Sequence, residues 1–297
     1  MSNLSNCALC NKDAELKLSH IIPKFVFRYL KKDSFTGRLR NALDPNIALQ
    51  DGDKEYLLCG ECEGLFSKGE TKFSNKFFQV FKKEGFSRLD YNNSWLNYFV
   101  TSVNWRTLYL DIDGYEKEED IKNKISTNQL SFLKKAEQIM RQYLQGERRD
   151  LDFIENHIFF FDTIKSIENE DHNLTTFHSL IQGSAFGYTV HTQNGGVYVF
   201  ANLSGIFIIT ILKKEKKEKW RNTFIKNEKG RIKSPQYSNS TVFSEIYYIA
   251  EQREHSYKRM SEKQKHLILD KAKQDVDGFK KSGSYQRIIK DSQISFL

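Results

Sequence analysis

The sequence predicts an α+β fold with a small N-terminal metal-binding module, a helical middle segment and a C-terminal domain of mixed strands and helices. The four cysteines of the 297-residue chain fall into two C-x-x-C pairs, both within its first quarter. Near residue 150 the apolar pattern changes from helical stripes to short strand-like runs. We therefore expect a metal-binding module over residues 1–70, a helical segment over 71–150 and an α+β domain with a recognition or regulatory role over 151–297.

The two cysteine pairs, Cys7 with Cys10 and Cys59 with Cys62, have the spacing of a zinc site. The short turn inside each pair lets both sulfur atoms reach one tetrahedral ion, and two pairs complete a closed structural site. Two redox pairs or unliganded core thiols are the alternatives. A redox pair usually opens a helix that follows a strand, and we expect no strand before Cys7. The spacing therefore predicts one structural Zn²⁺.

The segment between the cysteine pairs predicts how the module folds. Residues 14–22 alternate apolar and polar side chains, which is typical of a half-buried strand that Pro23 then ends. A short helix is expected over 25–30, and a second strand over 55–58 leads into the second cysteine pair. Cys62 should lie in the first turn of a helix. A first cysteine turn, a hairpin and a helix that opens at the second pair form the ββα-like treble-clef arrangement.

Apolar periodicity and turn residues define the other elements. In residues 71–150 three helical faces are expected, made of Phe73, Phe77, Val80 and Phe81, of Trp95, Leu96, Phe99, Val100 and Val103, and of Leu130, Leu133, Ala136, Met140 and Leu144. Residues 151–297 predict strands over 158–161, 185–192, 197–201 and 206–212, a hairpin turn at 193–196, and helices over 242–257 and 262–276.

The charge distribution favours a nucleic-acid partner, with DNA preferred. The formal net charge is +8, and residues 212–233 hold ten Lys or Arg against three Glu. A local excess of this kind suits a phosphate backbone, and a solvated lysine-rich surface is the alternative. The candidate phosphate contacts are Arg38, Arg40, Lys213, Lys214, Lys216, Lys217, Lys219 and Arg221.

Composition excludes two classes of protein. Hydrophobic residues make up 39% of the chain and aromatic residues 13%, which is too apolar for a disordered chain. The longest apolar run, residues 205–212, is too short to span a bilayer. The first residues contain neither an apolar signal core nor a basic leader, and the cysteine spacing is of the metal-binding type. We therefore expect a cytoplasmic protein, with no membrane partner.

Three short motifs resemble one known family. Residues 19–25 read Ser-His-Ile-Ile-Pro-Lys-Phe, residues 50–52 read Gln-Asp-Gly, and Leu58 to Glu63 contain the second cysteine pair. Together they are similar to the HNH superfamily of treble-clef zinc-finger endonucleases, and most closely to a bacterial subgroup of it. The resemblance covers about the first quarter of the chain. It implies metal-dependent cleavage of phosphodiester bonds in DNA and, by analogy only, a role in defence against phage.

The resemblance also implies roles for individual residues. The histidine at the strand end, here His20, is the general base that activates a water molecule. Glu63 holds the position of a ligand to a catalytic Mg²⁺ or Mn²⁺. Ser19 stands where the family commonly has an acidic ligand, so Asp51 and Asp53 are candidate replacements. The residues alone also allow a structural role for His20, and for Glu63 a favourable charge at a helix N-terminus.

Two alternatives to a nuclease are consistent with the sequence. The first is a catalytically silent treble-clef protein that binds nucleic acid or a protein partner. The second places an enzyme in residues 151–297, with the zinc module as an accessory. An oligomer or a regulatory partner is compatible with each of these hypotheses.

Overall fold

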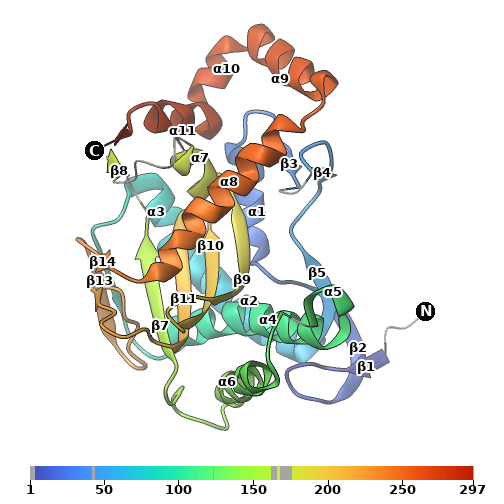
Figure 1. Cartoon of the computed structure of the whole chain (residues 1–297), viewed down its shortest axis with the longest axis vertical. Helices are drawn as coiled ribbons and strands as arrows, with labels where there is room; N and C mark the ends of the chain where they lie inside the picture. The colour runs from blue at the N-terminus through green and yellow to red at the C-terminus, as the bar shows by residue number, and fades with distance from the viewer. Residues whose placement is uncertain (1–3, 42–43, 123, 162–165, 168–175, 297) are drawn as a thin grey trace.

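The computed structural model describes residues 4–41, 44–122, 124–161, 166–167 and 176–296, and it confirms the predicted α+β class. The zinc module lies on one side, a central helix crosses the middle, and a four-stranded sheet covered by helices forms the other side (Figure 1). Among the described helices, none has both the length and the apolar character that crossing a bilayer requires.

The N-terminal module is a small antiparallel sheet followed by a helix. Its strands are β1 (Leu4–Asn6), β2 (Asp13–His20) and β5 (Lys54–Cys59), in the order β1-β2-β5. Between β2 and β5 lie α1 (Lys24–Asp33) and the short ladder of β3 (Leu39–Arg40) with β4 (Ala48–Leu49). Helix α2 (Gly60–Phe73) starts directly after Cys59, as the treble-clef prediction requires.

The middle of the chain is helical apart from one strand. Its elements are the π-helix η1 (Ser74–Phe78), α3 (Gln79–Glu84), β6 (Arg88–Tyr91), α4 (Trp95–Lys117), α5 (Glu119–Lys122) and α6 (Thr127–Gln145). Helix α6 begins with a capping box between Ser126 and Gln129 and ends at Gly146 in the left-handed conformation, so a few adjacent residues determine both of its ends.

The C-terminal half contains the main sheet and several peripheral elements. The strands are β7 (Glu155–Phe160), β8 (Ser166–Ile167), β9 (Ala185–His191), β10 (Val197–Leu203), β11 (Ile206–Lys213), β12 (Trp220–Arg221), β13 (Gly230–Lys233), β14 (Tyr237–Ser238) and β15 (Ser295–Phe296). The helices are α7 (Phe177–Ile181), the 3-10 helix η2 (Thr241–Ser244), α8 (Glu245–Lys258), α9 (Glu262–Gln274), α10 (Val276–Lys281) and α11 (Gly283–Asp291).

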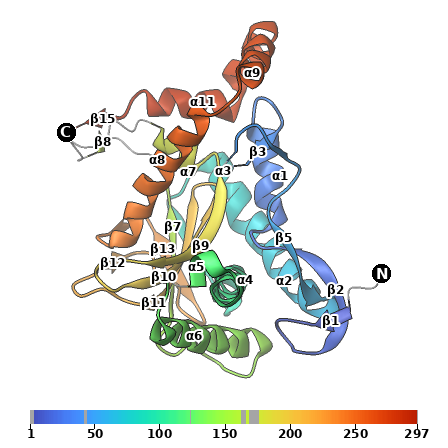
Figure 2. The ribbon, with the colours of Figure 1, turned by 45° about the vertical axis from the view of Figure 1, so that its right-hand side comes forward.

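The main sheet is antiparallel, in the order β7-β11-β10-β9. The predicted hairpin connects β9 to β10, and Gly195 supplies the positive φ of 79° that its turn needs. Strands β10 and β11 are buried along almost their whole length because helices cover both faces of the sheet. Helix α4 packs on one face and α8 lies on the other (Figure 2).

Helix α4 is buried on nearly every side between residues 96 and 108, where the sequence predicts only an apolar stripe. Several of its polar side chains bond to the sheet, and Asn104 Oδ1 is the one buried side-chain atom of this stretch without a partner among the described residues. The Nδ2 atom of Asn156 on β7 donates to Asn97 Oδ1 at 2.7 Å and to Thr101 Oγ1 at 2.8 Å. Thr210 Oγ1 on β11 donates to Asn156 Oδ1 at 2.6 Å. Each of these buried groups has a partner, so the network fixes α4 on the sheet without an unpaired polar atom at these positions.

The three predicted segments share their cores. One buried cluster joins the cysteines and Phe66 to residues of α4, α6 and the sheet, and a second joins α1 to α4 and the same sheet. The division at residues 70 and 150 stays a prediction, but the buried side chains on either side of each boundary pack together.

One predicted apolar face is altered by the π-helix. Phe73, Phe77 and Phe81 are buried, but Val80 is 43% exposed and Phe78 is buried in its place. A π turn contains one more residue than an α turn, so the apolar face shifts around the axis at this point. The prediction for Val80 is therefore wrong, because it assumed an uninterrupted period of 3.6 residues.

Candidate metal centre and adjoining site

The sulfur atoms of Cys7, Cys10, Cys59 and Cys62 converge on one point. All four lie within 4.8 Å of one another, and none forms a disulfide. The Cys10 and Cys59 sulfurs are 3.9 Å apart, close to the separation of about 3.8 Å that four Zn–S bonds of about 2.3 Å impose on a tetrahedron. The donor set therefore fits a structural Zn²⁺ ion. Four thiolates also suit Zn²⁺ better than the oxygen-preferring Mg²⁺ or Ca²⁺.

The backbone around the cysteines is arranged for a metal. The Cys59 N–H donates to Cys7 Sγ at 3.3 Å, which orients a sulfur and offsets part of its negative charge when it is a thiolate. Cys62 lies in the first turn of α2, as predicted. A short strand, β1, does precede Cys7, contrary to expectation. Cys7 and Cys10 nevertheless lie in a turn between two strands, whereas a redox pair would open a helix.

His20 lies at the C-terminal end of β2, where the chain turns towards α1. Its Nε2 atom is 2.9 Å from Asp51 Oδ2, and both side chains are mostly buried. Lys24 Nζ lies 4.0 Å from the same carboxylate oxygen. Burial opposes the charge of Asp51, but the hydrogen bond and the charge of His20 outweigh it, so the pKa of Asp51 lies below its ordinary value. Asp51 therefore remains an acceptor that orients the imidazole.

Glu63, the residue after the second cysteine pair, contacts β2 through Ser19 and not through His20. Ser19 Oγ donates to Glu63 Oε2 at 2.6 Å, and Ser19 is fully buried. The structure thus joins Ser19, the residue before His20 on β2, to Glu63, which the resemblance makes a metal ligand. In the part of the chain that the structure describes, the four cysteines are the one group of three or more ligating side chains around a common point. Glu63, Asp51 and Asp53 do not form such a group.

A buried arginine, which the sequence analysis did not assign to the site, links His20 to α2 and α4. Arg106 on α4 is 1% exposed. Its Nη1 donates to the His20 carbonyl oxygen at 2.6 Å, and its Nη2 to Glu70 Oε1 at 2.8 Å. The guanidinium also lies 5.4 Å from the centre of the Phe66 ring. A planar group with five donors is suited to holding these elements together. Its carboxylate partner, Glu70, lies further along α2 than Glu63.

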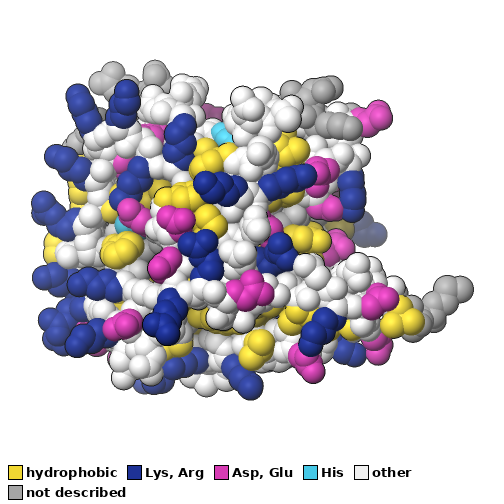
Figure 3. Space-filling model, turned by 90° about the horizontal axis from the view of Figure 1, so that it is seen from below, with side chains coloured by type: hydrophobic (Ala, Val, Ile, Leu, Met, Phe, Trp, Pro, Cys, Tyr) yellow, Lys and Arg dark blue, Asp and Glu magenta, His cyan; other side chains and the backbone are white. Residues whose placement is uncertain are grey.

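The basic segment lies on the opposite side of the molecule from the zinc module (Figures 1 and 2). Lys213, Lys214, Lys216, Lys217, Lys219 and Arg221 are all exposed, and Lys214 pairs with Glu155. Figure 3 shows Lys and Arg side chains gathered along the edge that corresponds to the side of β13 and β14 in Figure 1. In the loop near His20, Arg38 is exposed, but Arg40 donates within the chain to Pro45 O at 2.8 Å. These phosphate contacts stay predictions.

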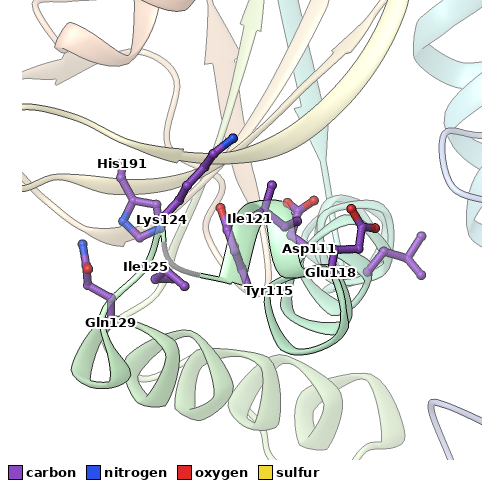
Figure 4. Close-up of a pocket in the computed structure, with 10 residues that line it drawn as sticks. Asp111, Tyr115, Glu118, Ile121, Lys124, Ile125, Gln129 and His191 are labelled. Carbon is purple, nitrogen blue, oxygen red and sulfur yellow. The ribbon is translucent and has the colours of Figure 1, made fainter.

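A cavity of about 340 Å³ with both polar and apolar lining residues lies apart from the zinc module, between α4, α5, α6 and the end of β9. Figure 4 shows Asp111, Tyr115 and Glu118 on one side with His191 across the cavity. The Nε2 atom of His191 is buried and has no partner among the described residues. Asp111 Oδ2 accepts the Thr189 N–H at 2.6 Å, and burial raises the pKa of Asp111 to about 6. This carboxylate is therefore costly to keep charged.

We expect the substitution Asp111→Asn to stabilise the protein in a pH-dependent way. In the wild type, folding raises the pKa of Asp111 from 3.8 to about 6, so the folded protein binds this proton more tightly than the unfolded chain does. The free energy of unfolding therefore falls as the pH rises through that interval. The amide oxygen of Asn can still accept the Thr189 N–H without a buried charge. The gain should grow from about pH 4 to about pH 6 and level off at about 3 kcal/mol near pH 7. Urea unfolding at several pH values measures it.

Asp113→Asn is the matched control, because Asp113 is on the same helix but has a side chain that is 41% exposed and paired with Lys117. It should change the free energy of unfolding by less than about 0.5 kcal/mol at every pH. A difference between Asp111→Asn and wild type that does not vary with pH would contradict the burial argument.

Comparison with known protein families, curated proteins and solved structures found no match for this chain. The fold and the site define an α+β protein with a four-cysteine centre that fits zinc at its N-terminus.

Proposed function

We propose that the chain is a metal-dependent, HNH-like endonuclease that cleaves phosphodiester bonds, with DNA as the favoured substrate. The single observation that carries the proposal is the His20–Asp51 pair at the end of β2, beside a helix anchored by two of the zinc cysteines. The zinc centre would fix the relative positions of strand and helix. The HNH resemblance of the surrounding motifs supports the same assignment.

The tautomer that Asp51 selects suits a general base. A charged carboxylate accepts a hydrogen bond, so the His20 Nε2 atom bonded to it carries the proton. Nδ1 then carries the lone pair and can take a proton from a water molecule that attacks the phosphate. Asp51 stabilises the imidazolium that results, because its negative charge lies 2.9 Å from the ring.

A divalent ion would supply charge neutralisation at the scissile phosphate and at the leaving oxygen. Glu63 would hold it, with Asp51 and Asp53 as further candidate ligands. Mg²⁺ is often bound by one or two carboxylates together with substrate phosphate and water, so one protein carboxylate is a sufficient anchor. The Ser19–Glu63 hydrogen bond would have to open for Glu63 to bind the ion.

The experiment is nicking of supercoiled plasmid in Mg²⁺ or Mn²⁺. We expect His20→Ala to lower the rate about 100-fold or more, because a general base contributes about 10² to 10⁴ in rate. His255→Ala, which removes an exposed histidine on α8, should leave the rate unchanged. Nicking that persists in His20→Ala, or that is absent from the wild type with either ion, would reject the proposal.

A catalytically silent nucleic-acid-binding protein is the second candidate. Two observations favour it. Glu63 and Glu70 of α2 already accept hydrogen bonds from Ser19 and Arg106, and the exposed lysines of residues 213–221 offer a phosphate-binding surface. It predicts DNA binding that weakens with salt and is unaffected by His20→Ala, without any nicking. A role in phage defence is part of the first proposal by analogy alone.

A further inference from the structure

The last three helices reach back over the N-terminal module. Residues 259–291, here called the C-terminal arm, contain α9, α10 and α11. Figure 2 shows the arm above α1 and β3, so segments more than 200 positions apart in the sequence are neighbours in space. Helix α9 has no buried residue, so its position depends on specific contacts rather than on a packed core.

The first group of contacts holds the tip of the loop that carries Asp51. Asn46 Nδ2 donates to Arg259 O at 3.2 Å, and the Ser261 N–H donates to Asn46 Oδ1 at 2.9 Å. Both terminal nitrogens of Arg40 donate to Gln264 Oε1 at 3.2 Å. The arm thus binds the loop on both sides of its turn.

The second group of contacts holds the start of the same loop. Asp33, the last residue of α1, forms an ion pair with Arg287 on α11. The Phe35 N–H donates to Ser284 Oγ at 3.3 Å, and the Phe35 ring lies edge-on to Phe279 at 5.1 Å. Helices α10 and α11 therefore touch the chain within a few residues of the end of α1.

A short path connects these contacts to His20. Arg40 pairs with Ala48 in the β3–β4 ladder, three positions before Asp51. On the far side of Asp51, Gly52 lies against the Phe27 ring so closely that a Cβ atom would be 2.0 Å from it. The loop is thus held at both ends of Asp51, by the ladder and by α1, and Asp51 in turn holds His20 at 2.9 Å.

We infer that the C-terminal arm positions Asp51, and through it the imidazole of His20. Gln264 and Arg287 are the positioning residues, and neither touches His20 itself. The inference rests on the proposed function for its catalytic consequence, but the positioning is a structural property that can be measured without activity. This inference gives residues 259–291 a regulatory role, because displacing the arm would leave Asp51 and the His20 imidazole free to move.

The test is the pair Gln264→Ala with Arg287→Ala, studied by long-range ¹H–¹⁵N spectra of the histidine rings at neutral pH. Such spectra show which nitrogen of an imidazole is protonated. In the wild type we expect the His20 signals of a fixed Nε2–H tautomer. In the double variant we expect them to shift towards the exchange-averaged signals of Asp51→Ala, and nicking to fall at least tenfold.

Two further variants make the result decisive. Lys273→Ala with Gln274→Ala removes one cation and one amide from exposed positions of α9 and should leave the wild-type spectrum. Gln264→Glu with Arg287→Lys keeps an acceptor and a cation at the two contacts and should restore the fixed tautomer. A wild-type His20 spectrum in the variant Gln264→Ala with Arg287→Ala overturns the inference. Shifted His20 signals with no nicking by the wild type would reject the nuclease and leave the positioning role intact.

Discussion

Replacing Cys62 with serine is expected to abolish zinc binding and to unfold the N-terminal module. The four sulfurs hold together segments about fifty residues apart, and a hydroxyl cannot replace a thiolate at a four-cysteine centre. Zinc binding by small modules contributes about 10 to 16 kcal/mol at neutral pH, and that energy is folding energy because no site exists in the unfolded chain. Only part of this energy should be lost here, because the module is also stabilised by packing on α4. We therefore expect a loss of about 4 kcal/mol or more.

Elemental analysis measures the predicted loss of zinc, and thermal unfolding measures the predicted loss of stability. The wild type should contain one zinc ion per chain, and Cys62→Ser close to none. Ser67→Ala, an exposed change one turn further along α2, should keep the ion and shift stability by less than about 0.5 kcal/mol. Full zinc occupancy in Cys62→Ser, or a wild type that a strong chelator neither strips nor destabilises, would contradict the assignment of the four cysteines to one zinc ion.

Each half of the four-cysteine centre could be predicted because its signal is local. Two residues separate the cysteines of each pair, and that spacing alone places both sulfurs on one ion. The same holds for the hairpin at Gly195 and for the capped ends of α6, where a few adjacent residues determine the backbone. In each case the physical cause and the sequence signature lie in the same short segment.

The surroundings of His20 could be predicted only in part, because their partners are distant in sequence. The strand end and the helix start follow from local patterns. The hydrogen bond from Ser19 to Glu63 spans 44 residues, and the one from Arg106 to the His20 carbonyl spans 86. An arginine inside a helix normally indicates an exposed position, and only the burial of α4 on every side reverses that expectation. The C-terminal arm is the extreme case, since Arg287 meets Asp33 across 254 positions.

The separation of the basic segment from His20 constrains how a nucleic acid could bind. The lysines of residues 213–221 and the end of β2 lie on opposite sides of the molecule (Figure 2). A substrate in contact with both would have to follow the surface around the protein, which a short duplex cannot do without bending. Charge reversal in residues 213–221 should therefore weaken binding of long DNA more than cleavage of a short oligonucleotide. The comparison separates recognition from catalysis.

The substitution Arg106→Met is expected to destabilise the protein by about 3 to 5 kcal/mol. It leaves the Glu70 carboxylate without its partner and the His20 carbonyl without its donor, and breaking one side of a buried pair costs more than the pair itself contributes. Arg141→Met is the matched control, because Arg141 also pairs with a glutamate, Glu137, but is more exposed than Arg106. This substitution should cost less than Arg106→Met, because Glu137 keeps the hydrogen bond from Trp105 Nε1 at 2.7 Å when Arg141 is removed.

The double variant Arg106→Met with Glu70→Gln separates charge from position. It removes the unpaired carboxylate, so it should recover part of the stability that Arg106→Met loses. It does not restore the donor to the His20 carbonyl, so nicking should stay low while the free energy of unfolding rises. Urea unfolding and plasmid nicking measured on the same variants distinguish the two effects. If stability and nicking recover together, Arg106 contributes only through its ion pair with Glu70, and its hydrogen bond to the His20 carbonyl has no separate effect on nicking.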